Sequence, residues 1–170
     1  EILIHDDAST DGTADIIQEY EAKYPDIIKP IYQTENQYSK GKKISATYNY
    51  PRTKGKYIAL CEGDDYWIDP YKLQKQVDFL EANPEYGLVH TNVKICRQIE
   101  NKFYETNDEL LNRKLSDIDL KERILAGDYI IRTCSVVMKK DLLKKIISSD
   151  DFLFQSRYFL MGDTPLWVEF

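Results

Sequence analysis

Short apolar runs alternate with amphipathic stretches through the first half of this chain, and this alternation constrains the fold more than any other feature. Four runs have the length and apolar character of buried strands: residues 2–4, 27–32, 56–61 and 87–93. Acidic residues follow the first and third runs directly, where a buried strand would reach the polar edge of a sheet. The pattern predicts buried strands separated by helices.

Two helices are expected between these runs. Ile16, Ile17, Tyr20 and Tyr24 recur at intervals of three to four residues, which predicts an amphipathic helix that Pro25 ends. A shorter helix is expected over residues 45–50. We expect most tyrosines on such stripes to lie in the core.

A third helix is expected before the fourth run. Asp69 is suited to cap it, and the following Pro70 suits its first turn. Leu73, Val77 and Leu80 form its predicted buried stripe, and the helix should end near residue 82.

Strands that alternate with helices are typical of a parallel sheet, because parallel strands need a crossover connection. We therefore expect an α/β fold with a mostly parallel sheet and helices on both faces. The chain shows no internal repeat or linker, so one domain should span residues 1–170. It opens on an apolar run without Met and stops within a pattern, so we expect a fragment truncated at both ends.

The second half of the chain is less regular than the first. Charge density rises and periodicity fades over residues 96–120, which predicts a loop-rich excursion over the surface. A helix at 120–126, an extended segment at 129–138 and a helix at 141–147 are expected to follow.

Charge and hydropathy exclude several classes of protein. The formal net charge is −6, from 23 basic and 29 acidic residues without a basic block, so we expect no binding to nucleic acid. No stretch approaches the roughly 20 apolar residues of a membrane span, and no basic and apolar leader opens the chain. A cytoplasmic protein is therefore expected.

The three cysteines support the same expectation. Cys61, Cys96 and Cys134 are an odd number, lie far apart and form no Cys-x-x-Cys pair. We expect reduced thiols in the core of an intracellular protein.

The two acidic clusters are the main candidates for chemistry. Asp6 and Asp7 follow the first run, and Glu62, Asp64 and Asp65 follow the third. In an open α/β sheet, ligands bind beyond the carboxyl ends of the strands. Carboxylates gathered there repel one another unless a cation intervenes, which predicts Mg²⁺ or Mn²⁺ at this edge. Capping of the following helices is the alternative role for these acids.

Residues 2–13 and 55–67 together resemble a family 2 glycosyltransferase of the GT-A fold, and the resemblance covers essentially the whole chain. It implies that the stretch with Asp6, Asp7 and Ser9 holds the nucleotide of a sugar donor. It also implies that Asp64 and Asp65 place a metal that bridges the donor diphosphate. Glu62 stands where Asp is commoner in this motif, so the role of this position stays open.

The resemblance also implies a catalytic base. Asp163 matches the position where inverting members carry the base, often in a Glu-Asp pair, with Gly162 here in place of the Glu. Such a base would take the proton of an acceptor hydroxyl. Its alternative role is to cap a helix that has Pro165 in its first turn.

The expected function is therefore metal-dependent transfer of a sugar from a nucleotide diphosphate, with a UDP-sugar favoured, to a hydroxyl acceptor. The acceptor would be a saccharide or a lipid-linked saccharide in bacterial surface-polysaccharide synthesis, with inversion at the sugar. Residues up to about 95 would bind the nucleotide, and residues 96–170 would face the acceptor. Association with the inner face of the membrane stays open. So do two alternatives: a nucleotidyltransferase, and a non-catalytic module that binds nucleotide or sugar.

Overall fold

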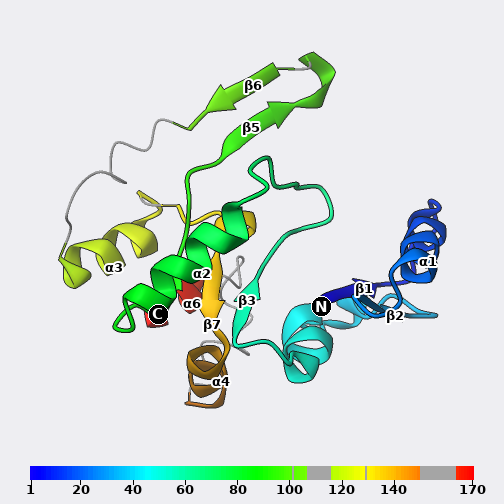
Figure 1. The fold of residues 1–170 in the computed structure, drawn as a ribbon, viewed down its shortest axis with the longest axis horizontal. Helices are drawn as coiled ribbons and strands as arrows, with labels where there is room; N and C mark the ends of the chain where they lie inside the picture. The colour runs from blue at the N-terminus through cyan, green and yellow to red at the C-terminus, as the bar shows by residue number, and fades with distance from the viewer. Residues whose placement is uncertain (101, 107–115, 129, 150–163) are drawn as a thin grey trace. The chain divides into compact units, whose positions relative to one another are not determined.

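The computed structural model describes residues 1–100, 102–106, 116–128, 130–149 and 164–170 (Figure 1). The chain divides into two compact units, Glu1–Gly55 and Lys56–Phe170. The described strands of the first unit form one two-stranded sheet, and those of the second unit form a three-stranded sheet and a two-stranded sheet.

The first unit is built on a strand, a helix and a second strand. Strand β1 (Ile2–Asp6) pairs in parallel with β2 (Ile28–Tyr32), and helix α1 (Thr13–Lys23) connects them. The register places Ile2 opposite Ile28 and Asp6 opposite Tyr32. A helical crossover lets the second strand run in the same direction as the first. The predicted strand, turn and helix are confirmed here.

Helix α1 buries a narrower stripe than its sequence predicts. Ile17 is buried, whereas Ile16, Tyr20 and Tyr24 are each at least half exposed. A two-stranded sheet is narrow, so one turn of the helix is enough to cover it. The prediction that these tyrosines lie in the core is wrong.

Arg52 joins the two strands of the first unit from one side. Its Nη1 donates to the Lys29 carbonyl at 2.7 Å, and its Nη2 donates to the Ile4 carbonyl at 2.9 Å. Nη2 also donates to Asn49 Oδ1 at 3.0 Å. The expected short helix is present as a π-helical turn, Ser45–Asn49, followed by a 3₁₀ turn, Tyr50–Arg52, and the second turn carries Arg52 into place.

The second unit has a three-stranded sheet in the order β3, β7, β4. Strand β7 (Val137–Lys139) lies in the middle and runs antiparallel to both β3 (Tyr57–Ala59) and β4 (Leu88–Val89). The α/β class is confirmed. Both strand pairings in this sheet are antiparallel, because β7 runs opposite to its neighbours, whereas β1 and β2 pair in parallel. Val137 and Met138 are almost fully buried, as a central strand requires. The apolar pattern of a buried strand is the same whichever way the strand runs, so the sequence could not show that β7 is antiparallel to its neighbours.

Helices cover this sheet. Helix α2 (Lys72–Ala82) packs on β4 and β7, and α4 (Lys140–Ser149) packs on β7. Helix α3 (Asp117–Ala126) packs on α6 (Thr164–Glu169). No helix among the described residues has both the length and the apolar content to cross a bilayer.

Helix α2 differs from its prediction in the face that it buries. Lys72, Gln76 and Leu80 are buried, whereas Leu73 is exposed and Val77 is half-buried. The stripe is shifted by one residue because the two polar side chains find hydrogen-bond partners beneath the helix.

The segment after β4 contains a hairpin. Strands β5 (Lys94–Arg97) and β6 (Lys102–Glu105) pair antiparallel, with Lys94 opposite Glu105 (Figure 1). The prediction of a loop-rich excursion over residues 96–120 is therefore wrong for this part. All four residues of β5 are exposed, so no buried face marks the strand in the sequence.

Candidate functional site

Asp6 ends strand β1 and turns inward. Its side chain is buried, with 5% of the residue exposed. Oδ2 accepts a 3.4 Å hydrogen bond from the Ser9 backbone N–H, and within the described part of the chain the buried Oδ1 has no hydrogen-bond partner. Asp6 and Ser9, predicted to act together, do lie in one turn.

Asp7 points to the loop that follows β2. Its Oδ1 accepts from the Gln37 N–H at 2.7 Å, and its Oδ2 accepts from the Tyr38 N–H at 2.9 Å. Although desolvation acts to raise it, these two hydrogen bonds lower the pKa of Asp7 below its ordinary value. The carboxylate thus braces the loop around residues 36–38, a role that its sequence position does not reveal.

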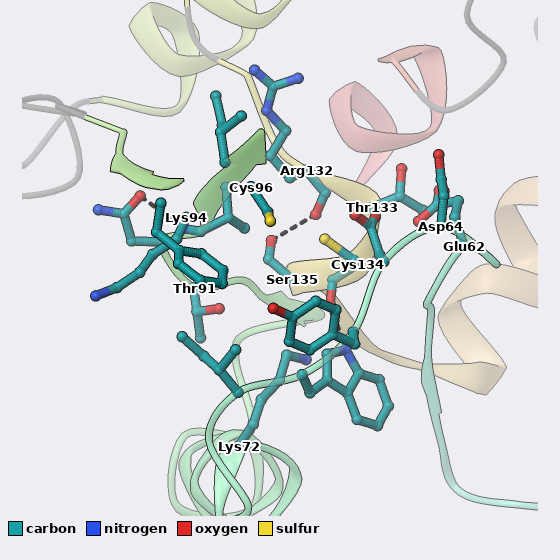
Figure 2. A pocket seen from close by; sticks show the side chains of 18 of the residues that line it. Glu62, Asp64, Lys72, Thr91, Lys94, Cys96, Arg132, Thr133, Cys134 and Ser135 are labelled. Carbon is teal, nitrogen blue, oxygen red and sulfur yellow. Dashed lines mark hydrogen bonds between the residues drawn. The ribbon is translucent and has the colours of Figure 1, made fainter. Parts of the chain in front are cut away.

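The second acidic cluster opens onto a cavity of the second unit. Glu62, Asp64 and Asp65 follow β3 and are exposed, and a turn bond joins the Asp65 N–H to the Glu62 carbonyl at 3.2 Å. The cavity has a volume of about 1230 Å³. Its other walls come from the start of α2, from the β5–β6 hairpin and from residues 130–135. Figure 2 shows Glu62 and Asp64 at one side of the cavity and Lys94 and Thr91 at the other.

Two thiols border residues 62–67, which we call the acidic loop. The Cys61 thiol donates to the Asp65 carbonyl at 3.6 Å. Burial, followed by a hydrogen bond to the Asp65 carboxylate, raises the pKa of Cys134 to about 12. Burial also raises the pKa of Cys61, and the neighbouring carboxylates add to the rise. All three cysteines are free thiols, as predicted, but Cys61 and Cys96 are exposed and are not core residues.

Trp67 anchors the far end of this loop. Its Nε1 donates to the Cys134 carbonyl at 2.8 Å, and the Lys72 ammonium lies 4.6 Å from the centroid of its ring. The neighbouring Tyr66 is 62% exposed. The structure thus gives Trp67 a hydrogen bond and a cation–π contact, and it adds Lys72 and Gln76 to the cavity wall. Sequence analysis missed both, because a Lys and a Gln in a helix are ordinarily assigned to solvent.

The carboxylates of the acidic loop could hold a cation only together with oxygen atoms of a bound ligand. Among the described residues, no group of three or more His, Cys, Asp or Glu side chains could hold a metal. Mg²⁺ is commonly held by one or two carboxylates together with substrate phosphates. Asp64 and Asp65 supply oxygen ligands of that kind at the cavity wall. The donor set therefore suits a metal that arrives with a diphosphate.

Two predictions about the site stay predictions. Asp163 lies outside the described residues, so its role as a base stays a prediction. The acid clusters after β1 and β3 belong to different units, so their expected meeting at one sheet edge stays a prediction as well.

Comparison with known proteins adds a family to this geometry. The protein-family model described as "Glycosyl transferase family 2" matches residues 1–147 of this chain. An uncharacterized protein of Mycobacterium tuberculosis is 38% identical over 144 residues, which are 82% of this chain and 38% of that protein. EpsE of Bacillus subtilis, named as a glycosyltransferase, is 40% identical over 97 residues, 56% of this chain and 33% of EpsE.

A further relative has a more specific name. It is the UDP-Glc:alpha-D-GlcNAc-diphosphoundecaprenol beta-1,3-glucosyltransferase WfaP of Escherichia coli. It is 38% identical over 82 residues, 48% of this chain and 30% of WfaP. This chain thus spans well under half the length of these three relatives.

Proposed function

Since this chain belongs to glycosyltransferase family 2 and has the GT-A fold of that family, we propose that it is a sugar-transfer enzyme. It transfers a sugar from a nucleotide diphosphate to a hydroxyl acceptor. One observation carries the proposal: an acidic loop at the end of a strand opens onto a large cavity. Ligand pockets commonly measure roughly 300–1,000 Å³. The cavity of about 1230 Å³ has room for a nucleotide sugar.

We assign the diphosphate end of the donor to the acidic loop. Asp65, with Asp64 beside it, would hold Mg²⁺ or Mn²⁺ together with the diphosphate oxygens. Such a cation, when bound, stabilises the negative charge that develops on the leaving diphosphate. The support is the donor set at the cavity wall, and the role of Glu62 stays open within the proposal.

We assign the nucleotide end of the donor to the turn after β1. Asp6 retains one carboxylate oxygen without a hydrogen bond among the described residues, and Ser9 lies in the same turn. Asp7 contributes by bracing the neighbouring loop around Gln37 and Tyr38. A UDP-sugar is the favoured donor, in line with the donor in the name of WfaP.

We assign the base to Asp163. A single displacement with inversion needs a carboxylate on the acceptor side, opposite the departing diphosphate. In the full protein, Asp163→Asn should lower kcat by roughly 10²–10⁴-fold and leave donor affinity unchanged. Equal kcat values for this variant and the wild type would remove Asp163 from the proposal.

The acceptor is the least constrained part of the proposal. A saccharide or a lipid-linked saccharide of a bacterial surface polysaccharide is favoured, since WfaP is named for a diphosphoundecaprenol acceptor. That acceptor would place the reaction in the cytoplasm at the inner face of the membrane. Residues 96–170 would then face the acceptor, and residues 1–95 would face the donor.

Calorimetric titration of this chain separates the proposal from its alternatives. UDP should bind in the presence of Mn²⁺ and bind far more weakly in EDTA. A nucleotidyltransferase would instead prefer UTP to UDP-glucose and release diphosphate. A non-catalytic module would bind UDP-glucose, but the full protein would not hydrolyse or transfer its sugar over long incubation.

A further inference from the structure

We propose that Lys72, Gln76 and Trp67 form a clamp that positions the acidic loop, with Lys72 as its central positioning residue. The loop in question is residues 62–67. The inference rests on the proposed function, because the consequence of positioning is read as nucleotide binding at Asp64 and Asp65. None of the three clamp residues is assigned a contact with the donor.

Lys72 is an unusual lysine for the first position of a helix. It is 8% exposed, and its Nζ donates to Gln76 Oε1 at 2.7 Å in a buried hydrogen bond. Burial lowers the pKa of Lys72. Within the described ranges it makes no ion pair with a carboxylate. The face of the Trp67 ring, 4.6 Å away, is its other close partner.

The partners of Lys72 reach one short segment of backbone. Gln76 Nε2 donates to the Ser135 carbonyl at 2.8 Å and to the Val89 carbonyl at 3.2 Å. Trp67 Nε1 donates to the carbonyl of the preceding residue, Cys134, at 2.8 Å. Figure 2 shows Lys72 rising from α2 toward the segment that carries Cys134 and Ser135. The clamp thus joins the acidic loop, α2 and the approach to β7.

The clamp lies close to the Asp65 carboxylate. Asp65 is two residues before Trp67, and its carboxylate meets the thiol of Cys134, whose carbonyl accepts the Trp67 hydrogen bond. The field of the Lys72 ammonium also reaches this loop, where it opposes the rise in the pKa of Cys61. The loop is therefore held at Trp67, two residues after Asp65.

Stability alone does not account for a lysine at this position. Replacing a buried charge by an apolar side chain of similar size is often neutral or stabilising. Methionine has nearly the length of lysine and could fill the same space under α2. The ammonium adds the bond to Gln76 and the contact with Trp67, which fix geometry.

The first test compares binding of UDP with Mn²⁺ in matched variants. Lys72→Met removes the ammonium, and Gln76→Glu keeps a partner for Lys72 but removes both N–H donors. Trp67→Phe removes the indole N–H together with part of the ring but keeps an aromatic face. Each should weaken binding roughly 10- to 100-fold, the usual effect of losing a group that orients a metal ligand. Lys144→Met, at an exposed lysine of α4, is the control and should bind like the wild type.

The second test reads the loop without any ligand. The chain has two tryptophans, and Trp167 is buried with no hydrogen bond to its Nε1 among the described residues. Trp167→Phe therefore leaves Trp67 as the single tryptophan and breaks no hydrogen bond that the described residues make. In that background, Lys72→Met should make Trp67 several-fold more accessible to acrylamide quenching, and Lys144→Met should not. Gln76→Glu repeats the test if Lys72→Met fails to fold.

The outcomes separate the clamp from the proposed function. Greater quenching with weaker UDP binding supports both. Greater quenching in a chain whose wild type binds no UDP supports the clamp and contradicts the function. Unchanged quenching with weaker binding would make Lys72 a direct ligand contact and overturn the clamp, and so would unchanged quenching with unchanged binding.

Discussion

Two acidic clusters follow two strands in this chain, and their carboxylates do different things. In the first unit, both oxygens of Asp7 accept backbone hydrogen bonds from one neighbouring loop. In the second unit, Asp64 has no hydrogen bond among the described residues, and the Asp65 carboxylate meets a single thiol. The same residue type after the same kind of element is thus a brace in one place and an exposed acid at a cavity wall in the other.

Backbone N–H groups within reach account for this difference. The loop after β2 presents two successive N–H groups to Asp7, because the parallel pairing of β1 and β2 brings the ends of both strands together. The acidic loop after β3 opens onto a cavity, where the Asp65 carboxylate meets the Cys134 thiol. A carboxylate that the protein already satisfies is poorly suited to bind a cation, whereas an unsatisfied one is well suited.

Asp65→Asn should have the largest effect. We expect Mn²⁺-dependent binding of UDP to weaken by about 100-fold or more, since the amide carries no charge for the cation. The thermal midpoint should stay constant or rise, because removing one acid relieves repulsion in an exposed cluster. Calorimetry and thermal unfolding measure the two effects, with Asp141→Asn as the control. Lost stability with unchanged UDP affinity would instead assign Asp65 to a structural role.

The reactivity of Cys134 should differ next most. With a pKa of about 12, its thiol should react with iodoacetamide at pH 8 at least about tenfold more slowly than the exposed Cys96. Burial is the main cause and Asp65 the second, so Asp65→Asn should recover part of the rate at Cys134 and none at Cys96. Mass spectrometry of timed samples gives both rates. Equal rates in the wild type would contradict the raised pKa of Cys134, and an unchanged rate at Cys134 in Asp65→Asn would contradict its contact with Asp65.

Asp7→Asn tests the brace in the first unit. The amide of Asn keeps one acceptor oxygen but turns an NH₂ group toward the other backbone N–H. The thermal unfolding midpoint at pH 7 should therefore fall by a few degrees. UDP affinity should change less than it does for Asp65→Asn.

The pH dependence of that difference has a definite sign. The folded pKa of Asp7 is lowered from its ordinary value of 3.8, so its contribution to stability is present above that pH and is lost as the pH falls through the lower, folded value. The gap between wild type and variant should be full at pH 7 and shrink below about pH 4. A gap that is constant with pH would show that Asp7 acts without its charge.

Ala8→Gly should have the smallest effect. Ala8 has φ of 63°, in the left-handed region that costs an L-residue roughly 1–2 kcal/mol. Glycine removes this strain but gives the unfolded chain more freedom, so we expect about 0.5 kcal/mol of added stability in urea unfolding. A clear loss of stability would indicate that the turn between Asp7 and Ser9 needs the methyl group.

The sequence predicted the elements of this fold better than their faces. Strands β2 and β3 and helix α2 lie within the predicted ranges, and β1 and α1 overlap theirs, because apolar periodicity reports burial. The buried face of α2 was mispredicted, because periodicity treats Lys72 and Gln76 as solvent-facing. Their burial depends on the Ser135 carbonyl, which is 59 residues away from Gln76 along the chain.

The candidate site shows the same limit. The motifs singled out Asp64 and Asp65, which line a cavity in the structure, but their predicted role as metal ligands stays a prediction. They could not separate the bracing role of Asp7 from the open one of Asp65, because the distinction depends on N–H groups supplied by residues 37 and 38. The hairpin β5–β6 was missed because exposed strands leave no apolar face to detect.

The reversed strand in the second unit also sets an order of events during synthesis. Strand β1 pairs with β2, which follows soon after it, so the first unit can close while the rest of the chain is still being made. Strand β3 has no sheet neighbour among the described strands until β7 emerges, because Tyr57 pairs with Lys139. Such distant pairing is slow to form. The acidic loop is therefore translated early and acquires its support late, so a chain stalled before residue 137 would carry those carboxylates on an unpaired strand edge.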